Sequence, residues 1–127
     1  MPEIIVVANQ KGGVGKTTTS INLAAALQRI NFKTLLVDLD SQGNATSASG
    51  LNRSTEKASV YDVLMGLKNI EECFVTSEHD GFMLLPSNSD LMAAEIEMLN
   101  IHNRESVLKE KINSISKQFD YILIDSP

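Results

Sequence analysis

The 127-residue chain is poor in cysteine and aromatic residues: it has one cysteine, no tryptophan, two tyrosines and four phenylalanines. A single cysteine cannot form an internal disulfide, and Cys73 has no second cysteine and no histidine at ligand spacing. A disulfide-stapled fold is therefore excluded within this stretch. One thiolate also argues against a carrier of iron–sulfur clusters, because such clusters need several cysteine ligands.

Long hydrophobic runs and a basic amino terminus are missing as well. No apolar run approaches the roughly 20 residues that cross a bilayer. The terminus Met1-Pro2-Glu3 is acidic, whereas a secretory signal begins basic. We therefore expect a cytoplasmic protein without membrane attachment. The net charge of −5 further argues against nucleic-acid binding by this stretch alone.

Short apolar runs alternate with segments of helical periodicity, within a length that suits one domain. The predicted strands are 3–8, 34–37, 82–85 and 121–125. The predicted helices are 17–30, 59–66, 90–99 and 105–119, and the polar stretch 41–53 is predicted to be a loop. Alternation of this kind predicts an α/β fold with a mostly parallel sheet, its strands buried on both faces by helices.

The segment between the first strand and the first helix, Lys11 to Thr18, reads Lys-Gly-Gly-Val-Gly-Lys-Thr-Thr. Its glycines allow backbone N–H groups to approach a phosphate chain, and the following helix adds its positive end. Lys16 would neutralise the β- and γ-phosphates, Thr17 would hold magnesium and Thr18 would contact the α-phosphate. A plain glycine turn explains the glycines but not the Gly-Lys-Thr-Thr. The predicted residues of this ATP-binding P-loop are Lys11, Gly12, Gly13, Val14, Gly15, Lys16, Thr17 and Thr18.

Three acidic residues follow predicted strands, at the edge of the sheet where ligands bind in such folds. Asp125 ends an apolar strand, as the Walker B acid that acts on Mg²⁺ does, directly or through water. Asp38 and Asp40 lie two residues apart, and one of them is expected to position or activate the attacking water. The alternative is that this pair only caps a loop. The predicted metal group is Thr17, Asp125 and Asp38.

Two blocks of the sequence resemble the ParA/Soj branch of the ParA/MinD superfamily of ATPases. Residues 8–19 read Ala-Asn-Gln-Lys-Gly-Gly-Val-Gly-Lys-Thr-Thr-Thr, and residues 36–46 read Leu-Val-Asp-Leu-Asp-Ser-Gln-Gly-Asn-Ala-Thr. The segments Tyr61–Leu64, Leu85–Ser87 and Asp125–Pro127 are similar to that branch too. The resemblance extends over the whole chain and favours chromosome or plasmid partition.

The resemblance implies a dimeric ATPase switch. Lys11 would be the signature lysine that reaches the partner subunit's nucleotide, and Asp40 matches the acid needed for hydrolysis, with Asp38 in support. The residues predicted for catalysis are Lys11, Lys16 and Asp40. The family's homodimer sandwiches two ATP molecules with Mg²⁺ and binds DNA without sequence preference, so it is nucleoid-associated when ATP-bound. A ParB-like partner then triggers hydrolysis.

The resemblance also implies that residues 1–127 are the N-terminal part of a single P-loop ATPase domain whose C-terminal remainder is absent. That remainder would carry the adenine pocket and most of the basic DNA-contacting surface. We expect the chain alone to bind DNA weakly and to expose apolar surface. Two alternatives stay open: a MinD-like regulator of the division site, and a small-molecule P-loop kinase or synthetase.

Overall fold

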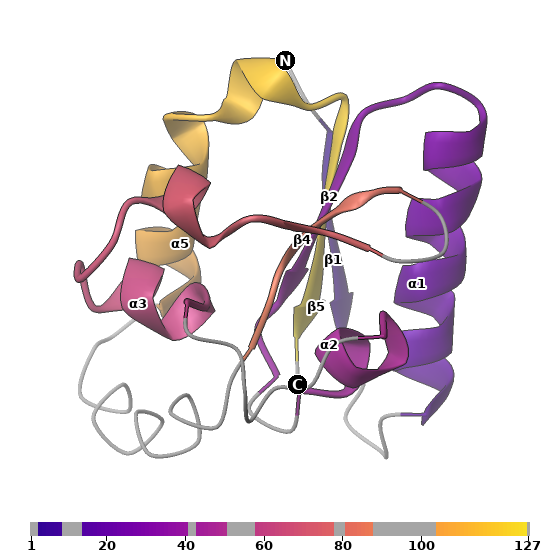
Figure 1. Cartoon of the computed structure of the whole chain (residues 1–127), viewed down its shortest axis with the longest axis horizontal. Coiled ribbons are helices and arrows are strands. Elements are labelled where there is room, and N and C mark those ends of the chain that lie inside the picture. Colours follow the sequence, from indigo (N-terminus) through magenta and orange to yellow (C-terminus); the bar gives the residue numbers. More distant parts are fainter. Residues whose placement is uncertain are drawn as a thin grey trace.

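The computed structural model describes residues 3–8, 14–40, 43–50, 58–77, 81–87 and 104–126. Within them, a five-stranded sheet of order β1-β5-β2-β4-β3 lies between two layers of helices (Figure 1). The strands are β1 (Glu3–Ala8), β2 (Thr34–Asp38), β3 (Val75–Thr76), β4 (Met83–Leu85) and β5 (Tyr121–Ser126). All neighbours pair in parallel except β3 with β4. The predicted α/β fold with a mostly parallel sheet is confirmed.

Helices cover both faces of this sheet. The α-helices are α1 (Val14–Arg29), α2 (Asn44–Ala48), α3 (Val60–Leu64) and α5 (Arg104–Asn113). The 3₁₀ helices η1 (Ile70–Cys73) and η2 (Ser116–Gln118) follow α3 and α5. In Figure 1, α1 and α2 lie on one side of the sheet, and α3 and α5 lie on the other. The helix predicted over 90–99 lies outside the described residues.

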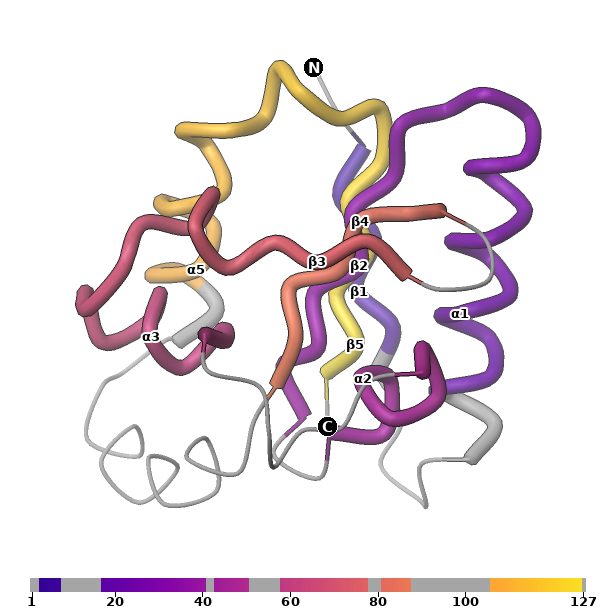
Figure 2. Tube along the Cα trace, in the orientation of Figure 1, coloured from indigo at the N-terminus to yellow at the C-terminus, as the bar shows by residue number. Residues whose placement is uncertain are grey.

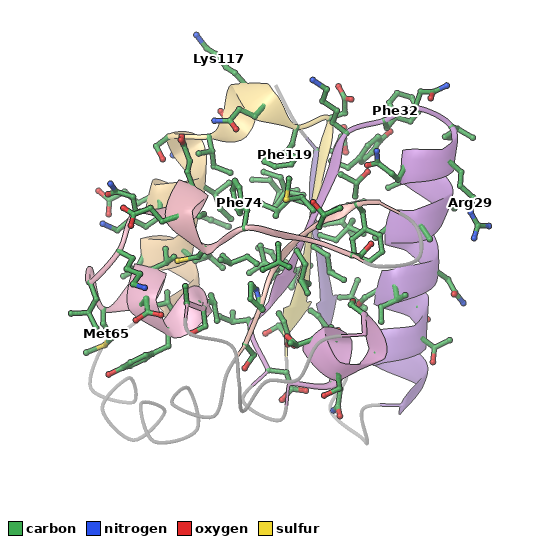
Figure 3. The ribbon with its side chains drawn as sticks, viewed as in Figure 1. Arg29, Phe32, Met65, Phe74, Lys117 and Phe119 are labelled. Carbon is green, nitrogen blue, oxygen red and sulfur yellow. The ribbon has the colours of Figure 1, made fainter. Side chains whose placement is uncertain are left out.

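Side chains of the central strands alternate between two hydrophobic clusters, as the two-residue period of a strand requires. In β2, Leu35 and Val37 face the cluster under α3 and α5, whereas Leu36 faces the cluster under α1. Phe74 and Phe119 point toward each other at the margin of the first cluster, with ring centroids 5.7 Å apart (Figure 3). The central strands are therefore buried on both faces, as predicted.

Strand β1 departs from that prediction. It lies at an edge of the sheet, where Ile4 and Val6 are 39% and 46% exposed. Ile5, on the opposite side, packs against the cluster under α1. The prediction of burial on both faces is wrong for this strand, because none of the described helices covers its second face.

Helix α1 lies close to the sheet because small side chains form its inner face. Ser20, Ala24 and Ala25 are buried there. The helix ends where predicted, since Asn31 adopts a left-handed conformation with φ of 70°, which asparagine tolerates better than most residues. The backbone N–H of Asn31 still bonds to the Gln28 carbonyl, at 3.1 Å, and so closes the last turn.

Two other helix predictions have different outcomes. The capping pair before α3 is confirmed: the Ser59 hydroxyl accepts from the first turn and Asp62 accepts from the Ser59 N–H. The helix predicted over 105–119 is shorter, because α5 ends at Asn113. The hydroxyls of Ser114 and Ser116 bond there to the carbonyls of Lys111 and Asn113, which competes with continued helix.

The loop predicted over 41–53 is wrong in part, since α2 forms within it. The parallel strands end at one edge of the sheet, at the bottom of Figure 2, and α2 lies at this edge beside the C-terminus. Ala45 of α2 is buried in the cluster under α1, which anchors this short helix. The sheet thus brings the first turn of α1, the end of β2, α2 and the end of β5 together.

Candidate functional site

The carboxylate of Asp125 is the centre of the site. It ends β5, is fully buried, and accepts a hydrogen bond of 2.9 Å from the Ser20 hydroxyl. Its other oxygen lies 3.5 Å from the hydroxyl of Thr17, which is also buried. Residues more than 100 positions apart therefore meet at the start of α1, as the sequence predicts for Thr17 and Asp125.

Asp38 lies beside Asp125, on the adjacent strand at the same register position. Its carboxylate is fully buried and accepts three hydrogen bonds. Oδ2 accepts from the Thr46 backbone N–H at 2.8 Å and from the Thr46 hydroxyl at 2.6 Å, and Oδ1 accepts from the Asp40 N–H at 3.2 Å. This carboxylate holds the segment after β2 in place.

Burial raises the pKa of Asp38 from 3.8 to about 6. The hydrogen bonds from Thr46 and from the Asp40 N–H lower the pKa and offset part of that effect, while the nearby charge of Asp125 raises it slightly. Removal of the carboxylate from water is therefore the dominant cause.

We expect Asp38 to make the metal-free protein less stable as the pH rises from about 4 to about 6. In this window the folded state keeps a proton that the unfolded state has already lost, because the folded pKa is the higher one. Asp38→Asn cannot titrate. Its unfolding free energy, measured by urea titration in the presence of a chelator, should rise by about 2 kcal/mol relative to that of wild type between pH 4 and pH 6. Parallel pH profiles of the two proteins would contradict this expectation.

Asp40 lies just beyond β2, at the same edge of the sheet. Its side chain is largely buried, with 7% exposed. Its backbone is held at both ends, since its N–H bonds to Asp38 and its carbonyl accepts from the Gly43 N–H at 2.9 Å. Gly43 has φ of 65°, a left-handed conformation that glycine adopts without strain. Hydrogen bonds to Asp38 and Gly43 therefore fix the backbone of Asp40.

The remaining predicted residues belong to the P-loop. Thr18 is an exposed residue of the first turns of α1, and the backbone of Val14, Gly15 and Lys16 begins this helix. Lys11, Gly12 and Gly13 lie outside the described residues. The start of α1, with its N–H groups and positive helix end, is thus next to the Asp125 carboxylate.

Sequence reasoning missed two residues of this site. Ser20 lies three positions after Thr17 on the same face of α1, so helical spacing would have indicated it. Thr46 had no such signal, because its contact with Asp38 depends on α2, which was predicted as loop.

The groups around Asp125 fit a magnesium ion. Mg²⁺ prefers oxygen ligands, and a buried hydroxyl and carboxylate lie together here. Asp38 offers less to a metal, since both its oxygens already accept hydrogen bonds from the protein. The arrangement therefore suits a metal held by Thr17 and Asp125, with Asp38 supporting the adjacent loop.

A comparison with known families agrees with this geometry. The model of the AAA domain family (AAA_31) matches residues 2–127. The chain belongs to this family.

In the part of the chain that the structure describes, no helix is long and apolar enough to span a membrane.

Curated relatives confirm the resemblance to ParA and Soj. The chromosome partitioning protein ParA of Myxococcus xanthus is 43% identical over 124 residues, which cover 98% of this chain and 44% of that protein. The sporulation initiation inhibitor protein Soj of Bacillus subtilis is 41% identical over 127 residues, or 100% of this chain and 50% of that protein. The chain thus spans about half the length of these relatives.

A similar fold occurs in a solved structure from Mycobacterium smegmatis. It is described as cobyrinic acid a,c-diamide synthase with bound ATP analog and magnesium. The two folds superpose with a TM-score of 0.91 at 39% identity, over 98% of this chain and 51% of that one. The carboxyl edge of the sheet in this chain therefore has a close counterpart in a protein that binds such a nucleotide.

Proposed function

We propose that the protein is a ParA-type ATPase that binds ATP with Mg²⁺ and hydrolyses it to ADP and phosphate. One observation carries the proposal: the buried pair of Thr17 and Asp125, 3.5 Å apart, at the first turn of α1. In a P-loop ATPase these two groups belong to the magnesium site. The solved relative with bound ATP analog and magnesium supports the binding of both ligands.

The nucleotide phosphates would lie at the start of α1. Backbone N–H groups of Gly12, Gly13 and Gly15 would donate to them, and the positive end of the 16-residue helix would add to this attraction. Lys16 would neutralise the β- and γ-phosphates, and Thr18 would contact the α-phosphate. Magnesium, when bound by Thr17 and Asp125, supplies charge neutralisation of the phosphates.

Asp40 is proposed as the acid that positions the attacking water. The backbone N–H and carbonyl of Asp40 are both hydrogen-bonded. This residue therefore has a defined place at the carboxyl edge of the sheet. A positioned carboxylate orients the water and takes up its proton as the new P–O bond forms, while ADP leaves.

We also propose that Lys11 completes the site of a second subunit, so that ATP binding and dimerisation are coupled. The relatives named ParA and Soj function in chromosome partitioning and sporulation control, which favours a DNA-associated switch stimulated by a ParB-like partner. With a net charge of −5, residues 1–127 offer little electrostatic attraction to DNA, and we expect this stretch alone to bind DNA weakly.

A small-molecule synthase is the second candidate. The description of the Mycobacterium smegmatis structure as a diamide synthase favours it. A synthase would couple ATP cleavage to a small acid substrate and would need neither a lysine in trans nor DNA. ATP-dependent dimerisation and retention on DNA therefore separate the two candidates.

The test of ATP–Mg²⁺ binding uses Thr17→Val and Asp125→Asn in the full-length gene product. Each variant removes one oxygen ligand, so Mg²⁺-dependent affinity for a fluorescent ATP analogue should fall roughly 10- to 100-fold. Thr19→Val is the matched control, because Thr19 is an exposed threonine of the same helix. Equal Mg²⁺-dependent affinity in all four proteins would refute the proposed magnesium site.

A further inference from the structure

Thr46 of α2 connects three segments at the carboxyl edge of the sheet. Its N–H and hydroxyl both bond to Asp38 at the end of β2, and its hydroxyl oxygen accepts from the backbone N–H of Ser87 at 2.9 Å. Ser87 follows β4, and both it and Thr46 are fully buried. One threonine thus joins the end of β2, α2 and the segment after β4.

The direction of these hydrogen bonds is fixed by chemistry. A backbone N–H only donates, so the Thr46 oxygen must accept from Ser87. The single hydroxyl hydrogen is then left for Asp38, at an oxygen–oxygen distance of 2.6 Å typical of a charge-assisted bond. The Thr46 hydroxyl can therefore bond to both Asp38 and Ser87 in only one way: it donates to Asp38 and accepts from Ser87.

This arrangement extends to Asp40. The carboxylate that accepts from Thr46 through Oδ2 accepts from the Asp40 N–H through Oδ1. The Asp40 carbonyl accepts in turn from Gly43, the residue that precedes α2. Asp40 therefore lies in a closed ring of contacts. Asp38 bonds to Thr46, the first turn of α2 connects Thr46 to Gly43, and Gly43 bonds to Asp40, whose N–H bonds to Asp38.

We propose that Thr46 is a positioning residue for hydrolysis, which acts through Asp38 to hold the Asp40 turn in its reactive place. This inference rests on the proposed function, because Asp40 matters only if ATP is hydrolysed. Thr46 does not touch the first turn of α1 in any hydrogen bond that the structure records for it, so its loss should spare nucleotide binding. A small misplacement of a reacting group is enough to slow a reaction roughly 100-fold.

The decisive variants are Thr46→Val and Thr46→Ser in the full-length gene product. Valine keeps the shape but removes the hydroxyl, which leaves Ser87 and Asp38 each without one partner. We expect kcat to fall roughly 10- to 100-fold, with KM for ATP and the affinity for a fluorescent ATP analogue within about twofold of wild type. Serine retains the hydroxyl and should restore most of kcat.

Ser49→Ala is the matched control. Ser49 is a buried hydroxyl residue at the end of the same short helix, and it bonds to the Ala45 carbonyl at 2.8 Å rather than to Asp38. It should lower the thermal midpoint as Thr46→Val does but leave kcat unchanged. A purely structural role for Thr46 predicts instead that both variants lower kcat only in proportion to their loss of folded protein.

The outcomes separate this inference from the proposed function. If wild type neither binds nor hydrolyses ATP, the proposed function fails. If wild type hydrolyses ATP and Thr46→Val has unchanged kcat, the inference fails while the proposed function stands. A Thr46→Val protein that loses nucleotide affinity in step with kcat, or a Thr46→Ser protein as slow as Thr46→Val, also overturns a positioning role for the hydroxyl.

Discussion

Replacing Asp40 by alanine is expected to slow ATP hydrolysis roughly 10²- to 10⁴-fold, the contribution of a positioned general base. Nucleotide binding should remain, because the Thr17–Asp125 pair and the start of α1 are not altered. The backbone hydrogen bonds of residue 40 to Asp38 and Gly43 should remain too, since neither uses the side chain. The variant is therefore expected to accumulate as an ATP-bound dimer.

Two measurements check this expectation: phosphate release under saturating ATP, and mass by light scattering with and without ATP. Asp120→Ala is the control, because Asp120 precedes β5 at the opposite edge of the sheet, where it accepts from the Lys33 N–H. It should hydrolyse ATP as wild type does. An Asp40→Ala protein with wild-type turnover would remove Asp40 from the mechanism, and one that stays monomeric in ATP would contradict the trapped state.

The central strands were predictable because their residues satisfy one strong condition. Leu36 and Leu123 face one hydrophobic cluster while their neighbours face the other, so the whole run must be apolar. The edge strand β1 has an equally apolar sequence, yet Ile4 and Val6 are exposed. Sequence alone does not reveal a strand's place in the sheet, which depends on pairing with distant residues.

Helix α2 was not predictable for the opposite reason. Asn44 to Ala48 has small and polar residues without an amphipathic pattern, and its glycine neighbours are typical of loops. Tertiary contacts form it: Ala45 packs in the cluster under α1, and Thr46 bonds to Asp38. Strand β3, with two residues, is too short to leave a periodic signal.

The meeting of Thr17 and Asp125 was easier to predict than the loops around them. A phosphate loop and a Walker B acid need fixed residue types at fixed strand ends, and the structure brings these two side chains together. The resemblance, and not the residue pattern, pointed to Asp40 as the acid for hydrolysis with Asp38 in support. The structure adds that the protein's own donors occupy Asp38, whose carboxylate accepts three hydrogen bonds.

Replacing Lys11 by alanine is expected to prevent ATP-dependent dimerisation while nucleotide binding by the monomer remains. Loss of one partner from a buried charge pair across an interface costs about 2–5 kcal/mol, so the dimer dissociation constant should rise at least roughly 30-fold. Lysine at this position is not required by a plain P-loop, whose phosphate-binding lysine is Lys16. Loss of Lys16 should therefore remove nucleotide binding, whereas loss of Lys11 should remove dimerisation alone.

That difference is the measurement. Light scattering with ATP reports dimerisation, and a fluorescent ATP analogue reports binding, in wild type, Lys11→Ala and Lys16→Ala. Lys16→Ala should lose affinity for the nucleotide and hence dimerisation as well, whereas Lys11→Ala should lose dimerisation alone. Hydrolysis of ATP could itself dissolve the dimer and mimic a loss of dimerisation. Combining Lys11→Ala with Asp40→Ala removes this ambiguity, because the double variant is not expected to hydrolyse ATP. A double variant that still dimerises in ATP would show that no lysine in trans is needed, and the proposed role of Lys11 would then be wrong.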